Sequence, residues 1–148
     1  MNSDEYITEL TASLTKHTES VGAKIDALLG HIPEKALRLN IEIFPSQDGE
    51  GDFSVRASLD GPDLFVLNKA IAPYADLIQV IHTPQGFDPD VPMVDPFDTE
   101  FEVNDVLTDC VAKWISDIWH ASGPRSISIP VSIVGHDDYG QTTPIDLK

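Results

Sequence analysis

The stretch that decides the fold is residues 36–44, "ALRLNIEIF", which is followed closely by residues 52–60, "DFSVRASLD". Hydrophobic side chains occupy every second position in both runs, which is the period of a strand with one buried face. The residues predicted to face the core are Leu37, Leu39, Ile41, Ile43, Phe53, Val55, Ala57 and Leu59. Two alternating runs around a connection rich in Pro, Gly and Asp predict a β-hairpin.

The connection itself, "FPSQDGEGDFS" at residues 44–54, has the acidic spacing of a calcium loop. With Asp48 as the first position, a calcium loop needs glycine at the sixth and glutamate at the twelfth. This sequence has Phe53 and Leu59 there. Gly49 and Gly51 instead suit the positive φ angles of a hairpin turn. We therefore predict a turn and no metal site.

Two amphipathic helices are predicted on either side of the hairpin. The first spans residues 4–29, begins at a Ser3 cap and ends at Gly30, and its apolar stripe is Ile7, Leu10, Leu14, Val21, Ile25 and Leu28. The second spans residues 105–121, is capped by Asn104 and ends at Gly123–Pro124. Its broad apolar arc is Val106, Leu107, Cys110, Val111, Trp114, Ile115 and Ile118. Trp119 lies at the border of this arc, so its indole is predicted to be partly exposed.

Four further segments complete the predicted fold. Residues 64–75 favour a short helix ending near Pro73, with a buried strand as the alternative. Residues 76–83 predict a third strand, apolar enough to be central, and residues 145–147 a short final one. Residues 126–134 alternate again, and Pro130 within them indicates an edge strand or a bulge. The whole chain, 1–148, is expected to be a single α+β domain: a mostly antiparallel sheet of four or five strands with both long helices packed on one face.

The formal net charge is −16, which excludes nucleic acid and anionic membranes as favourable partners. No Lys or Arg occurs between Lys69 and Lys113, so the negative charge is concentrated in that part of the chain. The chain holds one cysteine. Its N-terminus, "MNSDEY", lacks the basic flank and apolar run of a signal peptide. We expect a cytoplasmic protein.

Residues 84–101, "PQGFDPDVPMVDPFDTEF", contain four prolines and have no periodicity, which predicts an extended surface segment. Apolar residues surrounded by carboxylates are typical of an interface centre with a polar rim. The residues predicted to bind a basic protein partner are Phe87, Asp88, Asp90, Met93, Asp95, Phe97 and Asp98, together with Trp119 from the second helix. The alternative is that the apolar members pin the segment to the domain.

The sequence contains no nucleophile elbow, phosphate-binding loop or paired Cys/His metal motif. We assign no catalytic residue, metal ligand or cofactor. Cys110, inside the apolar arc, is expected to be a buried structural thiol. His136, Asp137 and Asp138 are the one place where histidine and carboxylates crowd together. Together with His82 they define an alternative, a small metal-dependent hydrolase.

The run "FPSQDGEGDFSVRASLDGPDLFVLNKAI" at residues 44–71 and the later "DPFD" at 95–98 resemble a family of small acidic actinobacterial proteins of unknown function. This resemblance implies a bacterial cytoplasmic protein and no particular activity. In size and acidity the chain is also similar to immunity proteins that block secreted toxins. We therefore expect a non-catalytic binding module, inhibitor-like or immunity-like. A homodimeric structural protein, paired through the first helix or an edge strand, is the third possibility.

Overall fold

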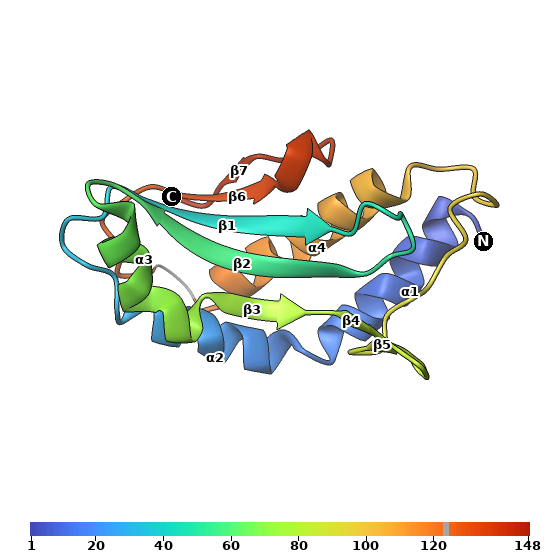
Figure 1. Ribbon diagram of the computed structural model, residues 1–148, viewed down its shortest axis with the longest axis horizontal. Helices are drawn as coiled ribbons and strands as arrows, with labels where there is room; N and C mark the ends of the chain where they lie inside the picture. Colours follow the sequence, from blue (N-terminus) through green and yellow to red (C-terminus); the bar gives the residue numbers. More distant parts are fainter. Residues whose placement is uncertain (123–124) are drawn as a thin grey trace.

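The computed structural model describes residues 1–122 and 125–148. It contains a five-stranded sheet with the order β3-β2-β1-β6-β7 and a separate hairpin, β4-β5. In Figure 1, α1, α2 and α4 form a layer behind the sheet, whose other face is turned toward the viewer. The predicted α+β class, with the long helices on one face, is confirmed. The helices are α1 (Ser3–Thr15), α2 (Thr18–Leu29), α3 (Leu64–Ile71) and α4 (Val103–Ala121), with short 3-10 turns η1 (Ala72–Tyr74) and η2 (His136–Asp138). The strands are β1 (Arg38–Pro45), β2 (Phe53–Asp60), β3 (Asp76–Gln79), β4 (Ile81–Thr83), β5 (Gly86–Asp88), β6 (Val131–Gly135) and β7 (Ile145–Asp146).

β1 and β2 form the predicted antiparallel hairpin, with Ile41 opposite Ala57. The predicted inward residues of both strands are buried, with the exception of Leu37. Leu37 precedes the first residue of β1, and its N–H donates to the Asp60 carbonyl at 2.8 Å, so its side chain is exposed beyond the end of the strand. The connection is a turn in which Gly49 and Gly51 have φ of 73° and 108°, as predicted.

The first predicted helix is two helices, α1 and α2. The backbone leaves the helical region at His17, which has φ −110° and ψ 4°. The Thr15 hydroxyl donates to the Thr11 carbonyl at 2.8 Å, a bond that favours bending of a helix. The apolar stripe passes over this break unchanged because Leu14 and Val21 are two helical turns apart and both are buried. Periodicity therefore predicted one helix where there are two. The N-cap is Asn2, whose side chain accepts from the Glu5 N–H, and not Ser3.

The third strand is at the edge of the sheet, whereas the sequence predicted a central position. β3 pairs with β2 alone and ends at Gln79, after which β4 turns away to pair with β5. For the strand after α4 the sequence predicted an edge position or a bulge, but β6 lies between β1 and β7, parallel to β1. Pro130 is compatible with this position because it comes just before β6, where its carbonyl accepts from the Leu39 N–H at 3.0 Å. The predicted final strand is present as β7.

α4 begins at Val103, earlier than predicted, and Asn104 does not cap it. The Asn104 amide donates instead to the Ser46 carbonyl at 3.0 Å, which ties the start of α4 to the β1–β2 connection. The predicted helix end at Gly123–Pro124 lies outside the described residues. Trp119 was predicted to be partly exposed, which is wrong: its side chain is 3% exposed, against 9% for Trp114.

Trp119 is buried because the chain after α4 returns over it. The Arg125 guanidinium lies 5.4 Å from its ring centroid, and Arg125 Nε donates to the Trp119 carbonyl at 3.1 Å. Arg125 also pairs with Asp26 of α2, so one cation joins α2, α4 and the segment leading to β6. The apolar arc was derived from the sequence of α4 alone, so it could not show that Arg125 covers Trp119.

Candidate functional site

The segment between β5 and α4 follows an extended path, as predicted, and is fastened to the domain by its own apolar residues. Val91 and Val94 are buried, and the Val94 N–H donates to the Glu50 carbonyl in the β1–β2 connection at 2.9 Å. Phe87 is buried as well, with its ring 5.4 Å from that of His82. β5 turns Phe87 into the core, so little of its side chain is available to the partner predicted to contact it.

Two apolar residues of the same segment remain exposed. Met93 is 47% exposed and Phe97 is 97% exposed. The side chains of Asp88, Asp90, Asp95 and Asp98 are also exposed. Within the part of the chain that the structure describes, none of these four carboxylates forms an ion pair. We call residues 88–98 the acidic segment. All the predicted contact residues within it lie at the surface, whereas the two predicted outside it, Phe87 and Trp119, are buried.

A local turn fixes the direction of Phe97. Asp95 Oδ1 accepts from the Phe97 N–H at 2.9 Å, and the Asp95 carbonyl accepts from the Asp98 N–H at 3.0 Å. These two bonds hold the backbone around Pro96 in a defined turn. The phenyl ring is thus presented to solvent from an ordered backbone, with a carboxylate on either side in sequence.

A polar hollow of about 460 Å³ lies beside this turn, between the β1–β2 connection and the start of α4. Its lining includes Pro96 and the three carboxylates of Asp48, Glu100 and Glu102. These negative charges can accept a lysine or arginine side chain, which brings several donors and a long apolar stem. The sequence showed each carboxylate but not the hollow, because Asp48 comes to Glu100 only through tertiary packing.

Asp105 and Asp109 belong to the same charged stretch of sequence but have a structural role. Asp105 Oδ1 accepts from the Gly140 N–H at 2.8 Å. Asp109 Oδ1 accepts from the N–H groups of Gln141 and Thr142 at 2.8 and 2.9 Å and from the Thr142 hydroxyl at 2.8 Å. One turn of α4 therefore holds the chain before β7, and these two charges are not free for a partner.

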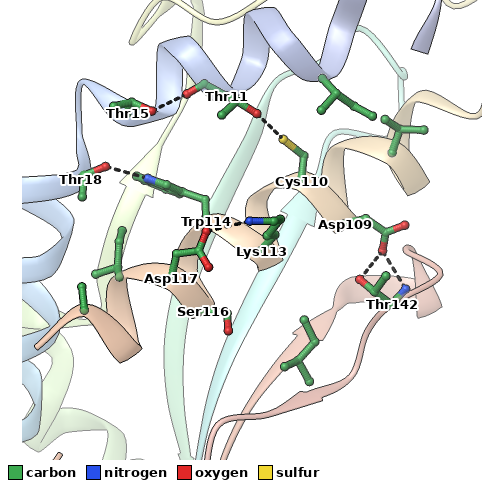
Figure 2. A pocket seen from close by; sticks show the side chains of 15 residues that line it. Thr11, Thr15, Thr18, Asp109, Cys110, Lys113, Trp114, Ser116, Asp117 and Thr142 are labelled. Carbon is green, nitrogen blue, oxygen red and sulfur yellow. Dashed lines mark hydrogen bonds and ion pairs between the residues drawn. The ribbon is translucent and has the colours of Figure 1, made fainter. Parts of the chain in front are cut away.

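A second cavity is an apolar groove of about 780 Å³ along the outer side of α4, with α1 on one flank and the chain before β7 on the other (Figure 2). α1 contributes Ile7, Thr11 and Thr15 to the lining. Trp114 was predicted to be a core residue, and it is mostly buried, yet one edge of it lines this groove. We call this cavity the α1–α4 groove.

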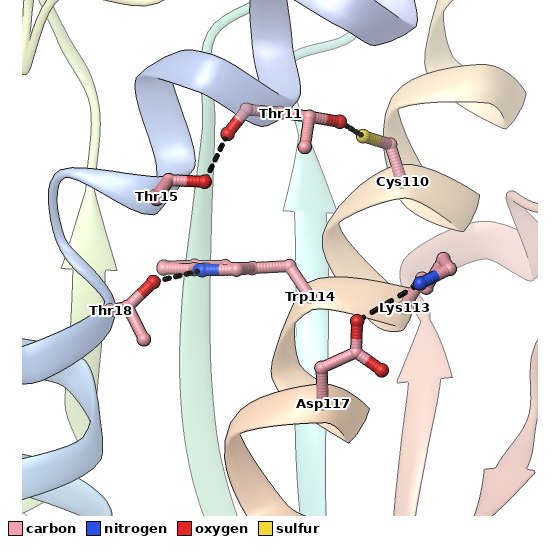
Figure 3. A network of polar contacts seen from close by, with 7 residues as sticks. All are labelled: Thr11, Thr15, Thr18, Cys110, Lys113, Trp114 and Asp117. Atoms are coloured by element: carbon pink, nitrogen blue, oxygen red, sulfur yellow. Dashed lines mark hydrogen bonds and ion pairs between the residues drawn. The ribbon is translucent and has the colours of Figure 1, made fainter. Parts of the chain in front are cut away.

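Several polar groups that line the groove are bonded within the protein, as Figure 3 shows for those on α1, α2 and α4. The Trp114 indole N–H donates to the Thr18 hydroxyl at 3.0 Å, and Thr11 Oγ1 lies 3.4 Å from Cys110 Sγ. Lys113 forms an ion pair with Asp117 at 3.0 Å. Cys110 was predicted to be buried and is half-buried. Burial raises the pKa of its thiol, so the reactive thiolate is disfavoured near neutral pH.

Two members of the histidine–carboxylate cluster predicted in the tail stay close together, since His136 Nε2 lies 3.6 Å from Asp137 Oδ1. His136 Nδ1 lies 2.7 Å from Glu42 Oε2 on the open face of the sheet, and its ring packs 4.7 Å from that of Phe44. Asp137 accepts from the Gln47 amide at 3.1 Å. His82 is in the β4–β5 hairpin, which follows β3, and β3 is at the opposite edge of the sheet from β6 and β7 (Figure 1). In residues 1–122 and 125–148 no three His, Cys, Asp or Glu side chains are placed to share a metal ion.

The whole chain, residues 1–148, matches a family described as "Family of unknown function (DUF6389)". The protein belongs to this family. No curated protein matches it. No solved structure matches it either. None of the helices described in the structure combines the length and the apolar character needed to cross a membrane. The membership confirms the expected family of unknown function.

Proposed function

We propose that this family member is a cytoplasmic, non-catalytic binding module whose acidic segment holds a basic protein partner. The observation that carries the proposal is Phe97, an almost fully exposed aromatic ring on an ordered turn. An exposed large aromatic side chain contributes most to binding when a partner buries it. A backbone already in its bound conformation reduces the entropy lost on association.

The charges around Phe97 indicate the kind of partner. Asp95 and Asp98 flank the ring in sequence, and the hollow with Asp48, Glu100 and Glu102 lies beside it. A net charge of −16 adds long-range attraction for a basic surface. An inhibitor or immunity-like role, in which the acidic segment covers a basic active site, uses each of these features.

The two alternatives are supported by fewer observations. A hydrolase would need its reactive groups in a cavity, and neither the hollow nor the groove includes His136 in its lining. The His136–Glu42 pair lies instead on the open sheet face. A homodimer would need an exposed apolar surface, for which Leu64, Phe65 and Val66 on α3 are available. The size of the free protein in solution separates that possibility from the first.

The test is capture of partners from the native cytoplasm at low and high salt, followed by binding kinetics with each purified protein retained. Two variants address the acidic segment: Phe97→Ala, and a triple change of Asp90, Asp95 and Asp98 to Asn. Asparagine keeps an acceptor at position 95, so the turn around Phe97 is preserved while the charge is removed. The matched controls are Phe65→Ala, an exposed aromatic on α3, and the triple change Glu19→Gln, Glu34→Gln and Asp63→Asn.

We expect a basic protein to be retained at low salt. Phe97→Ala should mainly raise its dissociation rate, and the acidic triple variant should mainly lower its association rate. Both controls should bind like the unaltered protein. The proposal fails if no basic protein is enriched at low salt, or if the captured protein responds to the control variants as strongly as to the segment variants.

A further inference from the structure

We propose that the α1–α4 groove is a binding site for an uncharged, largely apolar small molecule. This inference is independent of the acidic segment, which lies between β5 and α4. The groove volume of about 780 Å³ is in the range of small-molecule sites, which are mostly apolar with a few polar groups. The apolar part of its lining comes from three elements of the chain: Ile7, Val106, Trp114, Ile118, Ala121 and Ile145.

The charges in the lining indicate that the ligand is uncharged. The lining contains three ionisable carboxylate or ammonium groups, those of Asp109, Lys113 and Asp117. Lys113 and Asp117 neutralise each other at 3.0 Å. Asp109 accepts hydrogen bonds from three donors, the Gln141 N–H, the Thr142 N–H and the Thr142 hydroxyl. A charged ligand entering the groove would lose its hydration without gaining an unpaired opposite charge, which is unfavourable.

The polar uncharged groups lead to the same ligand class. The indole N–H is already bonded to Thr18, the Thr15 hydroxyl to the Thr11 carbonyl, and the Thr142 hydroxyl to Asp109. An extended peptide would bring backbone N–H and C=O groups that each need a partner here. The Thr18 hydroxyl accepts from the indole and can still donate its own hydrogen. The Ser116 hydroxyl also lines the groove and can donate. The groove therefore suits an apolar molecule with one or two neutral acceptors.

Cys110 makes the groove directly testable because it is the only cysteine in the sequence and lines the cavity. The probes are Nile red, a neutral apolar dye, and anilinonaphthalene sulfonate, an anionic one. The first measurement is saturable dye fluorescence. The second is the rate at which N-ethylmaleimide alkylates Cys110, with and without each dye. Nile red should slow alkylation about tenfold at nine-tenths occupancy, since only free protein reacts, whereas the anionic dye should have little effect.

Two modified proteins locate the binding. Thr15→Trp places a large side chain in the groove from the exposed end of α1, and Ala12→Trp is its control, exposed on the same helix but outside the lining. Thr15→Trp should weaken Nile red binding at least about tenfold, and Ala12→Trp should leave it unchanged. Protein already alkylated at Cys110 should also lose the dye, and it serves as the test if Thr15→Trp does not fold.

Four results would overturn the inference. One is the absence of saturable Nile red binding. Another is binding that leaves Cys110 unprotected, which would locate the dye on the exposed Leu64, Phe65 and Val66 of α3. The third is a dimer in which Cys110 is protected without dye, which would identify a second copy of the chain as the occupant. Equal protection by the anionic and neutral dyes would refute the assignment of an uncharged ligand.

Discussion

Gly51 joins the β1–β2 connection to the acidic segment so closely that a single methyl group should disturb both. Its φ is 108°, a conformation that residues with a side chain rarely adopt. A Cβ at this position would lie 2.6 Å from the Pro92 carbonyl oxygen and 3.8 Å from the Tyr6 hydroxyl. The close neighbour is backbone, so it cannot move away by a side-chain rotation. Gly51→Ala therefore combines backbone strain with a collision.

Gly86 offers a control that separates these two effects. Its φ is 113°, nearly the same, but a Cβ there would meet nothing within 4 Å. Gly86→Ala should cost only the strain, about 1–3 kcal/mol in the free energy of unfolding. Gly51→Ala should cost a similar amount plus about 1–3 kcal/mol for overpacking. Together this is about 2–6 kcal/mol, a large part of the ~5–15 kcal/mol that stabilises a typical domain.

The assay is urea unfolding followed by tryptophan fluorescence and by far-ultraviolet circular dichroism. Coincident transitions would justify a two-state analysis. We expect Gly51→Ala to unfold at a clearly lower urea concentration than Gly86→Ala, with similar slopes for both. Equal losses would refute the reasoning, because they would mean that the 2.6 Å approach to Pro92 relaxes at no cost. Loss of partner binding in Gly51→Ala alone would show that Pro92 positions the acidic segment.

Three further outcomes are expected. Trp119→Ala should lower the free energy of unfolding by about 3–5 kcal/mol, at least as much as Trp114→Ala, in urea titrations; a clearly smaller loss would contradict the burial of Trp119 under Arg125. Burial, and then the nearby Asp48 carboxylate, raise the pKa of Asp52, so its ionisation destabilises the folded state as the pH rises through that pKa. Asp52→Asn should therefore raise the melting temperature at about pH 7, by less at about pH 4, and a constant difference would exclude titration as the cause. Calcium at about 1 mM should leave the melting curve unchanged, because Phe53 and Leu59 are buried in β2 where a calcium loop needs glycine and glutamate; a shift that disappears in the Asp48→Ala, Asp52→Ala double variant would contradict this.

The elements that the sequence predicted well are those whose pattern is local and repeated. The hairpin of β1 and β2 follows from alternation over eight residues in each strand. The apolar stripe of α1 and α2 likewise identified the buried Leu10, Leu14 and Val21. The missed break at His17 shows the limit of this evidence. Periodicity shows which side of a helix is buried. Because α1 and α2 bury the same side, their apolar residues form one continuous stripe, and the stripe does not reveal the break between them.

The acidic stretch shows a second limit. In sequence, the carboxylates from Asp76 to Asp109 are alike, and nothing local separates those that bind a neighbour from those that face solvent. The fold uses Asp105 and Asp109 to hold residues 140–142 and leaves Asp95 and Asp98 exposed around Phe97. It also turns Phe87 inward, although Phe87 and Phe97 have similar acidic neighbours in the sequence.

By itself, the sequence determined the α+β class, the hairpin and the acidic character, because each depends on composition or on a period of a few residues. The tertiary structure alone decided the order of the strands, the burial of Trp119, the acidic hollow and the α1–α4 groove. Each of these depends on residues far apart in the chain, such as Thr18 with Trp114 and Asp26 with Arg125. Contacts of this kind form only when the helices pack on the sheet, and no local pattern in the sequence specifies which residues will meet.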